Sequence, residues 1–197
     1  MTNDSVMHKI EINKCCFDIF PELESERLIY REVNSEDVED IFKIYGDPEV
    51  AKYDWYRPID TKENALSIIN RYKKEFKNKE EITWGVARKK DNKIIGYCNL
   101  GDFDDESRRS EIGYGFNRDE WNKGYATEAI KTLVKFGFEV MCLHRIEAVV
   151  TFGNDASVKA LKKANFTQEG IVRERTIMKG KFEDDVILGI LEKDYRL

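Results

Sequence analysis

The chain has 197 residues, of which 41% are hydrophobic and 36% are charged, and its formal net charge is −5 at pH 7. This length and balance predict one globular domain with a sizeable core, and they exclude a fibrous or disordered chain. An acidic chain without a basic stripe also argues against nucleic acid or an anionic membrane surface as a partner.

The cysteines and the N-terminus give the expected location. Cys15, Cys16, Cys98 and Cys142 form no C-x-x-C pair, and neither histidine lies at metal-ligand spacing from them. We therefore expect reduced thiols and no metal site. The first residues lack the basic start and apolar core of a signal peptide, and no apolar run approaches the ~20 residues that cross a bilayer. The expected location is the cytoplasm.

Hydrophobic periodicity predicts a single domain over residues 23–197, with residues 1–22 as an N-terminal extension laid on it. In chain order the pattern predicts a strand over 28–33, a helix over 35–46, a helix starting at 60–63 with an apolar face through 76, strands over 82–88 and 94–102, a strand ending at 116, a helix over 125–141, a strand over 146–151, a helix over 154–164, and strands over 166–175 and 185–191 around a turn at 179–181.

This order mixes an antiparallel meander with crossover helices. The expected fold class is therefore α/β or α+β, with helices on a central sheet.

The junction between the strand ending at Phe116 and the next helix, Trp121 to Ala129, carries the clearest chemical signal. Backbone N–H groups at a helix start have no intrahelical partner and, with the helix dipole, attract anions. A glycine just ahead of them, Gly124, lets the main chain approach a phosphate closely. The junction thus predicts a phosphate or pyrophosphate site; the alternative is an ordinary strand-to-helix turn.

Five motifs occur in one order along the chain: Phe20-Pro21-x-Leu23-x-Ser25-Glu26-Arg27-Leu28-x-x-Arg31, Glu111-Ile112-Gly113-Tyr114, Trp121–Ala129, Asn154-x-x-Ser157 and Glu169-Gly170-x-x-Arg173. Together they resemble the N-acetyltransferases of the GNAT superfamily, and most of all its RimJ/RimL-like branch, over residues 21–197. The resemblance implies the GNAT fold, a mixed, mostly antiparallel sheet flanked by helices, in which a splayed strand pair forms the CoA cleft. It also implies acetyl-CoA as cosubstrate and direct transfer of the acetyl group to a primary amine in a ternary complex.

The resemblance also implies a set of cofactor-binding residues. The main chain of Phe116 would face the thioester and the pantetheine arm, and Asn154 would hydrogen-bond a pantetheine amide, a role compatible with a plain helix cap. Asn122 and Asn165 stand where relatives commonly have glycine, and asparagine tolerates left-handed backbone angles. The pyrophosphate would be held by the amides of Asn122, Lys123, Gly124, Tyr125, Ala126 and Thr127.

Catalysis needs a route for the proton of the attacking amine, and Glu111 is the first candidate for the general base. The alternative for Glu111 is an ion pair with Arg108 or Arg109. Ser157 matches a serine that is a proposed acid in the RimJ/RimL branch; alternatively it supports the helix start or binds CoA.

Tyr53 and Trp55 lie between the first two helices, in the region that lines the acceptor entrance in this family; alternatively they pack against the sheet. The acceptor would be a protein N-terminal α-amine or a small amine, including the antibiotic or polyamine type. A non-catalytic acyl-CoA-binding regulatory module is a further alternative, and the chain would be a monomer or a homodimer.

Overall fold

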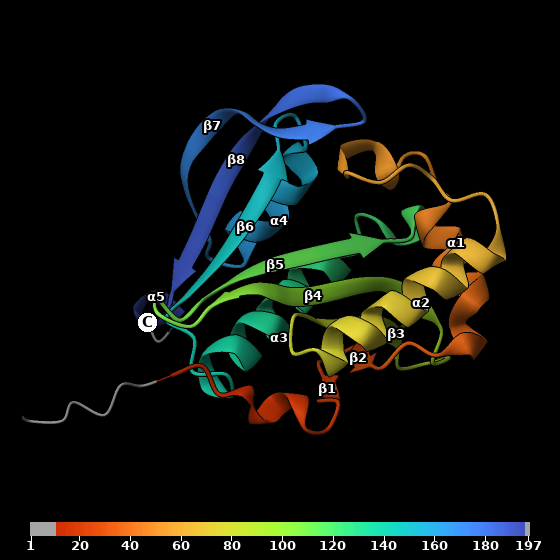
Figure 1. Cartoon of the computed structure of the whole chain (residues 1–197), viewed down its shortest axis with the longest axis horizontal. Helices are drawn as coiled ribbons and strands as arrows, with labels where there is room; N and C mark the ends of the chain where they lie inside the picture. The colour runs from red at the N-terminus through yellow and green to blue at the C-terminus, as the bar shows by residue number, and fades with distance from the viewer. Residues whose placement is uncertain (1–10, 196–197) are drawn as a thin grey trace, which may run out of the picture.

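The structure, a computed structural model, describes residues 11–195 and contains an eight-stranded sheet with the order β1-β2-β3-β4-β5-β6-β8-β7 (Figure 1). Neighbouring strands pair antiparallel, except that β5 and β6 are parallel. The predicted mixed, mostly antiparallel sheet is confirmed.

The strands are β1 (Leu23–Glu24), β2 (Leu28–Arg31), β3 (Ile82–Arg88), β4 (Ile94–Asp104), β5 (Arg109–Phe116), β6 (Arg145–Thr151), β7 (Thr167–Met178) and β8 (Lys181–Leu191). The helices are α1 (Val38–Tyr45), α2 (Lys62–Lys77), α3 (Tyr125–Glu139), α4 (Asp155–Lys163) and α5 (Glu192–Tyr195). Short 3-10 helices cover Lys14–Phe17, Ser35–Asp37, Ala51–Tyr53 and Arg118–Glu120.

Three features of this list differ from the predictions. The short elements β1 and α5 were not predicted, because elements of two and four residues are too short to show a period. The last two strands are longer than expected, since most of β7 is exposed and has no apolar alternation to mark it. The turn between them, at Lys179 and Gly180, lies where the sequence predicts it.

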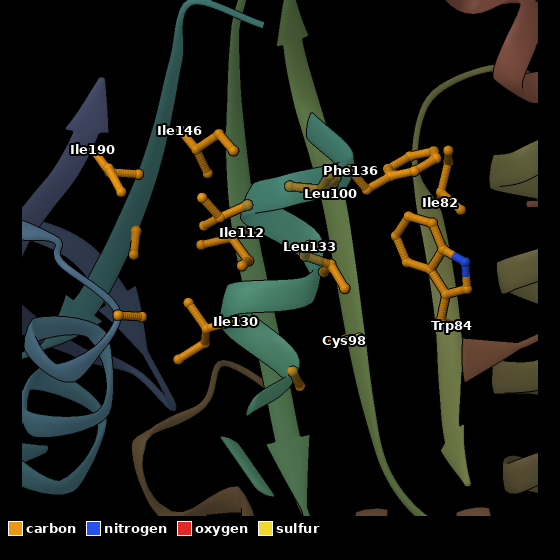
Figure 2. Packing of buried hydrophobic residues seen from close by; sticks show 14 of the residues in the cluster. Ile82, Trp84, Cys98, Leu100, Ile112, Ile130, Leu133, Phe136, Ile146 and Ile190 are labelled. Atoms are coloured by element: carbon orange, nitrogen blue, oxygen red, sulfur yellow. The ribbon is translucent and has the colours of Figure 1, made fainter. Parts of the chain in front are cut away.

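The core lies mainly between the sheet and α3. Figure 2 shows Ile130 and Leu133 of α3 facing Ile112 on β5, and all three side chains are buried. At one end of this core the ring of Phe136 meets the ring of Trp84 edge-on, with 5.4 Å between their centroids. A second, smaller cluster lies under α1 and α2 on the opposite face (Figure 1). The molecule therefore has three layers, as the predicted class requires.

The sheet forks between β5 and β6. These strands pair at Arg109↔Arg145, Ser110↔Ile146 and Glu111↔Glu147, and no further pair follows in the described chain. Beyond the fork β5 stays with β4 as far as Phe116, while β6 stays with β8 as far as Thr151. Figure 1 shows the two strands starting together and diverging. The splayed strand pair expected from the sequence is confirmed.

The described part of the predicted N-terminal extension packs on the domain. Ile12 and Phe17 are buried in the main core cluster, and the N–H of Asn13 donates to the carbonyl of Met141 at 2.8 Å. Residues 1–10 lie outside the described range, and the domain boundary at residues 22 and 23 stays a prediction. No helix within residues 11–195 is long and apolar enough to cross a membrane.

Candidate active site

The loop before α3 has the backbone that the sequence predicts. Asn122 has φ 61° and Gly124 has φ 82°, so both occupy the left-handed region that asparagine and glycine tolerate. Asn165, the other asparagine in a glycine position, has φ 69°. Helix α3 begins directly after Gly124, and no side chain caps it. The N–H groups of its first turn are therefore available to a ligand.

Two sequence motifs that lie about a hundred residues apart meet beside this loop. Glu128 Oε1 accepts from Ser25 Oγ at 2.7 Å and from the N–H of Arg27 at 2.8 Å, while Oε2 accepts from Arg27 Nε at 2.7 Å. The Arg27 guanidinium also lies 4.5 Å from the centre of the Tyr125 ring and donates to the carbonyl of Lys123 at 2.9 Å. Burial alone would raise the pKa of Glu128, but these hydrogen bonds lower it below its ordinary value. The contacts hold the loop at the end of α3.

The open edge of β5 presents main-chain groups to the fork. Asn117 donates its N–H to Ile95 on the β4 side at 2.8 Å, and peptide groups alternate along a strand, so the N–H of Phe116 faces the β6 side. The carbonyl of Phe116 accepts from Trp121 Nε1 at 2.8 Å. Its N–H is thus the group at this residue that can bind a ligand, while its ring is buried.

A hydroxyl pair lies on the other side of the fork, at the start of α4. Asn154 caps the helix through its Oδ1, which accepts from the N–H of Ser157 at 3.3 Å, and its amide nitrogen can still donate to a ligand. The Ser157 hydroxyl lies 2.6 Å from the hydroxyl of Tyr114 on β5. Burial raises the pKa of Tyr114 well above its ordinary value, so its hydroxyl is neutral. Tyr114 therefore places a second hydroxyl beside Ser157, a contact that sequence reasoning missed.

A cavity of about 510 Å³ opens from this fork toward α2 and the segment after α1. Ser157, Asn154, Tyr114, Tyr53 and Trp55 all line it, and the Tyr53 ring lies beside Gly153, next to Asn154. The structure thus brings the predicted catalytic and substrate residues to one space. Trp55 is 63% exposed, which fits an entrance, whereas its neighbour Tyr56 packs on Tyr45 with 4.8 Å between the ring centroids.

Glu111 lines the cavity next to the fork. Burial raises the pKa of its carboxyl, and the nearby charge of Asp102 raises it further. The alternative ion pair with Arg108 or Arg109 does not form within residues 11–195. Arg109 pairs instead with Asp102 at 3.0 Å and with Glu147 at 3.3 Å, and Arg108 donates to a main-chain carbonyl at 3.2 Å. The geometry leaves the Glu111 carboxylate facing the cavity.

Several cavity-lining residues were missed by the sequence reasoning, because they come from elements that only the fold brings together. A signal exists on β4, where Tyr97, Asn99 and Gly101 alternate with the buried Cys98 and Leu100. The missed charged and polar residues of the lining include Asp54, Arg71, Glu75, Glu81, Thr83, Tyr97, Asn99, Arg175, Thr176 and Asp185.

The residues around the fork fit the pyrophosphate and pantetheine of CoA. A side chain added at Gly124 would approach only Arg27 Nη2, at 3.4 Å, so the space in front of the uncapped helix is open. The gap between β5 and β6 has unpaired strand edges on both sides, which suits an extended, amide-bearing chain. Within residues 11–195 no three His, Cys, Asp or Glu side chains gather as a metal site would require.

Comparison with known proteins agrees with this geometry. The acetyltransferase (GNAT) domain family matches residues 27–167. A Bacillus subtilis (strain 168) protein named uncharacterized N-acetyltransferase YoaA is 33% identical over 174 residues, which cover 88% of this chain and 98% of the relative. A GNAT-family acetyltransferase structure from Bacillus anthracis has a TM-score of 0.79 and 26% identity, covering 88% of this chain and 99% of that one.

A structure of spermidine N-acetyltransferase from Vibrio cholerae in complex with CoA and spermine has a TM-score of 0.75 and 21% identity, with 88% of this chain and 100% of that chain covered. At this identity the likeness shows the fold alone. The family match and the YoaA relative show more: this chain belongs to the GNAT family of N-acetyltransferases. The fold and the enzyme class predicted from the sequence are confirmed.

Proposed function

We propose that the protein transfers the acetyl group of acetyl-CoA directly to a primary amine that binds in the cavity. The observation that carries the proposal is the fork: β5 and β6 separate after Glu111↔Glu147, between the uncapped start of α3 and the cavity. When bound, acetyl-CoA supplies the thioester from which the acetyl group is transferred.

On this proposal the loop residues hold the cofactor. The amides from Asn122 to Thr127 bind the pyrophosphate, and the left-handed Asn122 and Gly124 turn the main chain toward it. Asn154 donates its side-chain amide to the pantetheine arm. The N–H of Phe116, which faces the fork, stabilises negative charge on the carbonyl oxygen as the amine attacks.

Proton transfer is assigned to groups at the fork. Glu111 takes the proton of the amine, directly or through water, and its raised pKa brings it closer to the range in which a general base is effective. Ser157, whose hydroxyl lies 2.6 Å from that of Tyr114, acts as the acid by donating a hydrogen bond to the departing thiolate, and the proton that completes the thiol comes from solvent.

The cavity supports direct transfer rather than a covalent acetyl-enzyme. No cysteine is among the described residues that line it, so it offers no thiol to carry the acetyl group. Cys16 and Cys98 are buried in the core, and burial raises the pKa of both thiols.

The test is thiol release from acetyl-CoA with the full-length protein and a panel of N-terminal peptides, alkyl amines and aminoglycosides. We expect amine-dependent release of CoA with at least one acceptor class. CoA binding without turnover on any amine would contradict the proposal and favour the non-catalytic binding module. The RimJ/RimL-like branch and a cytoplasmic location stay predictions, and acetylation of N-terminal peptides would support the branch.

A further inference from the structure

The floor of the cavity is the face of β4 and β5 that is turned toward α2. Gly113 lines the cavity there, and Gly101 and Gly115 lie on the same face beneath side chains that line it. At each of three glycines a polar side chain from the neighbouring strand fills the position of the missing Cβ. Glu81 leans over Gly101, with Oε2 2.7 Å from that position, and the other two pairs are Asn99 over Gly113 and Tyr97 over Gly115. The floor is therefore polar, although it lies in the middle of a sheet.

Glu81 and Glu111 are neighbours on this floor. Gly101 is the cross-strand partner of Glu111. On its other side Gly101 lies opposite Glu81, which directly precedes the residue that pairs with Leu100. Cross-strand partners point to the same face, so the two carboxylates flank the bare Gly101. Thr83 Oγ1 donates to Glu81 Oε1 at 2.7 Å and keeps the Glu81 side chain over the glycine.

A third carboxylate, that of Asp54, lies toward the other end of the floor. Asp54 accepts from its neighbour's main-chain N–H at 3.1 Å and from Tyr97 Oη at 3.4 Å. Gly101 and Tyr97 are four residues apart on β4, which is about 13 Å along a strand. An acceptor that reaches both ends must carry its polar groups several carbon atoms apart.

The lining is strongly unbalanced in charge. Its acidic residues are Asp54, Glu75, Glu81, Glu111 and Asp185, and its basic residues are Arg71 and Arg175. Arg175 pairs with Asp185 at 3.4 Å, and Arg71 lies 3.7 Å from Glu75. The other three carboxylates have no ion pair within residues 11–195. Burial raises the pKa of Asp54 and of Glu111.

Aromatic walls and an unpartnered hydroxyl complete the site. Tyr45 stacks on Tyr97 with 5.0 Å between the ring centroids, and Tyr56 packs on Tyr45. The Tyr56 hydroxyl is buried and has no hydrogen-bond partner among the described residues, although it can accept one from an ammonium group. Arg71 is the cation at this end, and it already lies beside Glu75 and over the Trp55 ring. Carboxylates between aromatic faces are the groups that bind organic ammonium ions.

We propose that the acceptor is a small polycation with at least two ammonium groups, one acetylated at the fork and another held by the unpaired carboxylates of Glu81 or Asp54. This specificity rests on the proposed acetyl transfer. It disfavours N-terminal peptides without further positive charge, because such peptides leave those carboxylates uncompensated. Alkyl polyamines and amino sugars share the required chemistry.

The test compares 1,5-diaminopentane with pentylamine, which has the same chain length and one ammonium group fewer. We expect kcat/KM to be about tenfold or more higher for the diamine, the effect of one charge-assisted hydrogen bond. The ratio should fall severalfold in Glu81→Gln. It should be unchanged in Glu80→Gln, which removes one negative charge at the exposed neighbouring position. Spermidine and an aminoglycoside, run beside them, distinguish the two sources of polycation.

Calorimetry with the two amines in the absence of acetyl-CoA gives a second readout, and we expect heat of binding for the diamine alone. A diamine-to-monoamine ratio near one would overturn the inference and leave the acetyltransferase standing. The same holds if a peptide whose α-amine is its only positive charge is turned over as well as the diamine. Failure to acetylate any amine would overturn the proposed function, and diamine binding by calorimetry would then still decide the charge preference.

Discussion

At the scale of single residues, Glu111 carries the most specific chemical role. Its substitution Glu111→Gln keeps the shape of the side chain and removes the base, so we expect kcat to fall about 10²–10⁴-fold. A base works when deprotonated, so the wild-type rate should rise with pH as Glu111 loses its proton. Because burial and Asp102 raise this pKa, the rise should lie above the ordinary glutamate value of 4.5. Initial rates across pH would show it, and the same rise in Glu111→Gln would contradict the role.

The hydroxyl pair of Tyr114 and Ser157 gives a second prediction at this scale. Tyr114→Phe removes the 2.6 Å contact with little change in shape. We expect kcat to fall about tenfold, the effect of losing one hydrogen bond of about 1.4 kcal/mol, while the Kd for CoA stays unchanged. Tyr195→Phe, which also loses a hydroxyl contact but far from the fork, is the matched control. Equal losses in the two variants would argue against a role at the thiolate.

At the scale of elements, the contact between α3 and the turn before β2 positions the cofactor loop. Glu128→Gln weakens its hydrogen bonds to Ser25 and Arg27, and we expect unfolding by urea to become easier by about 1–2 kcal/mol. The pKa of Glu128 is lowered in the folded state. Its contribution to folding stability is therefore fully present above the pKa that it has in the unfolded chain, and is lost as the pH falls through the folded-state pKa. The difference from wild type should therefore shrink below about pH 4.5. Glu63→Gln, exposed in the first turn of α2, is the control. A difference that stayed constant with pH would contradict this.

Elements also show what the sequence can and cannot predict. The left-handed Asn122, Gly124 and Asn165 follow from residue chemistry at single positions, and the structure has all three. The β7 strand depends on its pairing with β8, which shifts register between Val172 and Thr176, and no local pattern encodes that. In consequence Arg175 and Thr176 line the cavity, whereas their neighbour Glu174 is exposed and does not line it.

Part of the candidate site could be predicted from the sequence, and part could not. The cofactor loop and the fork lie on consecutive elements, and the sequence motifs predict them. The acceptor side is built from α2, β3, β4 and the segment after α1, which meet only in the folded protein. Nothing in the sequence distinguishes Asp54 and Glu81 from ordinary surface acids. Only the position of Glu81 over Gly101 and the hydrogen bond of Asp54 with Tyr97 show that they belong to the site.

At the scale of the whole molecule, the sheet acts as two arms joined at the fork. One arm contains β1 to β5 and is covered by α1 and α2 on one face and α3 on the other, and the other arm contains β6, β8 and β7 (Figure 1). Contacts also join the second arm to the segment after α1: Lys179 Nζ donates to the carbonyl of Ala51 at 2.6 Å, and Thr151 Oγ1 donates to that of Tyr53 at 3.1 Å. Both arms therefore frame the space in which an acceptor would meet the cofactor.

CoA binding at the Gly124 loop is tested most directly by isothermal titration calorimetry of CoA against the full-length protein and two variants. Gly124→Val puts a side chain into the open space before α3, and Gly180→Val imposes the same backbone strain in the β7–β8 turn, where nothing lies within 4 Å. We expect wild type and Gly180→Val to bind CoA alike and Gly124→Val to lose about tenfold or more in affinity, since a side chain there excludes the pyrophosphate. No heat with the wild-type protein, or an unchanged affinity in Gly124→Val, would contradict a pyrophosphate site at this loop.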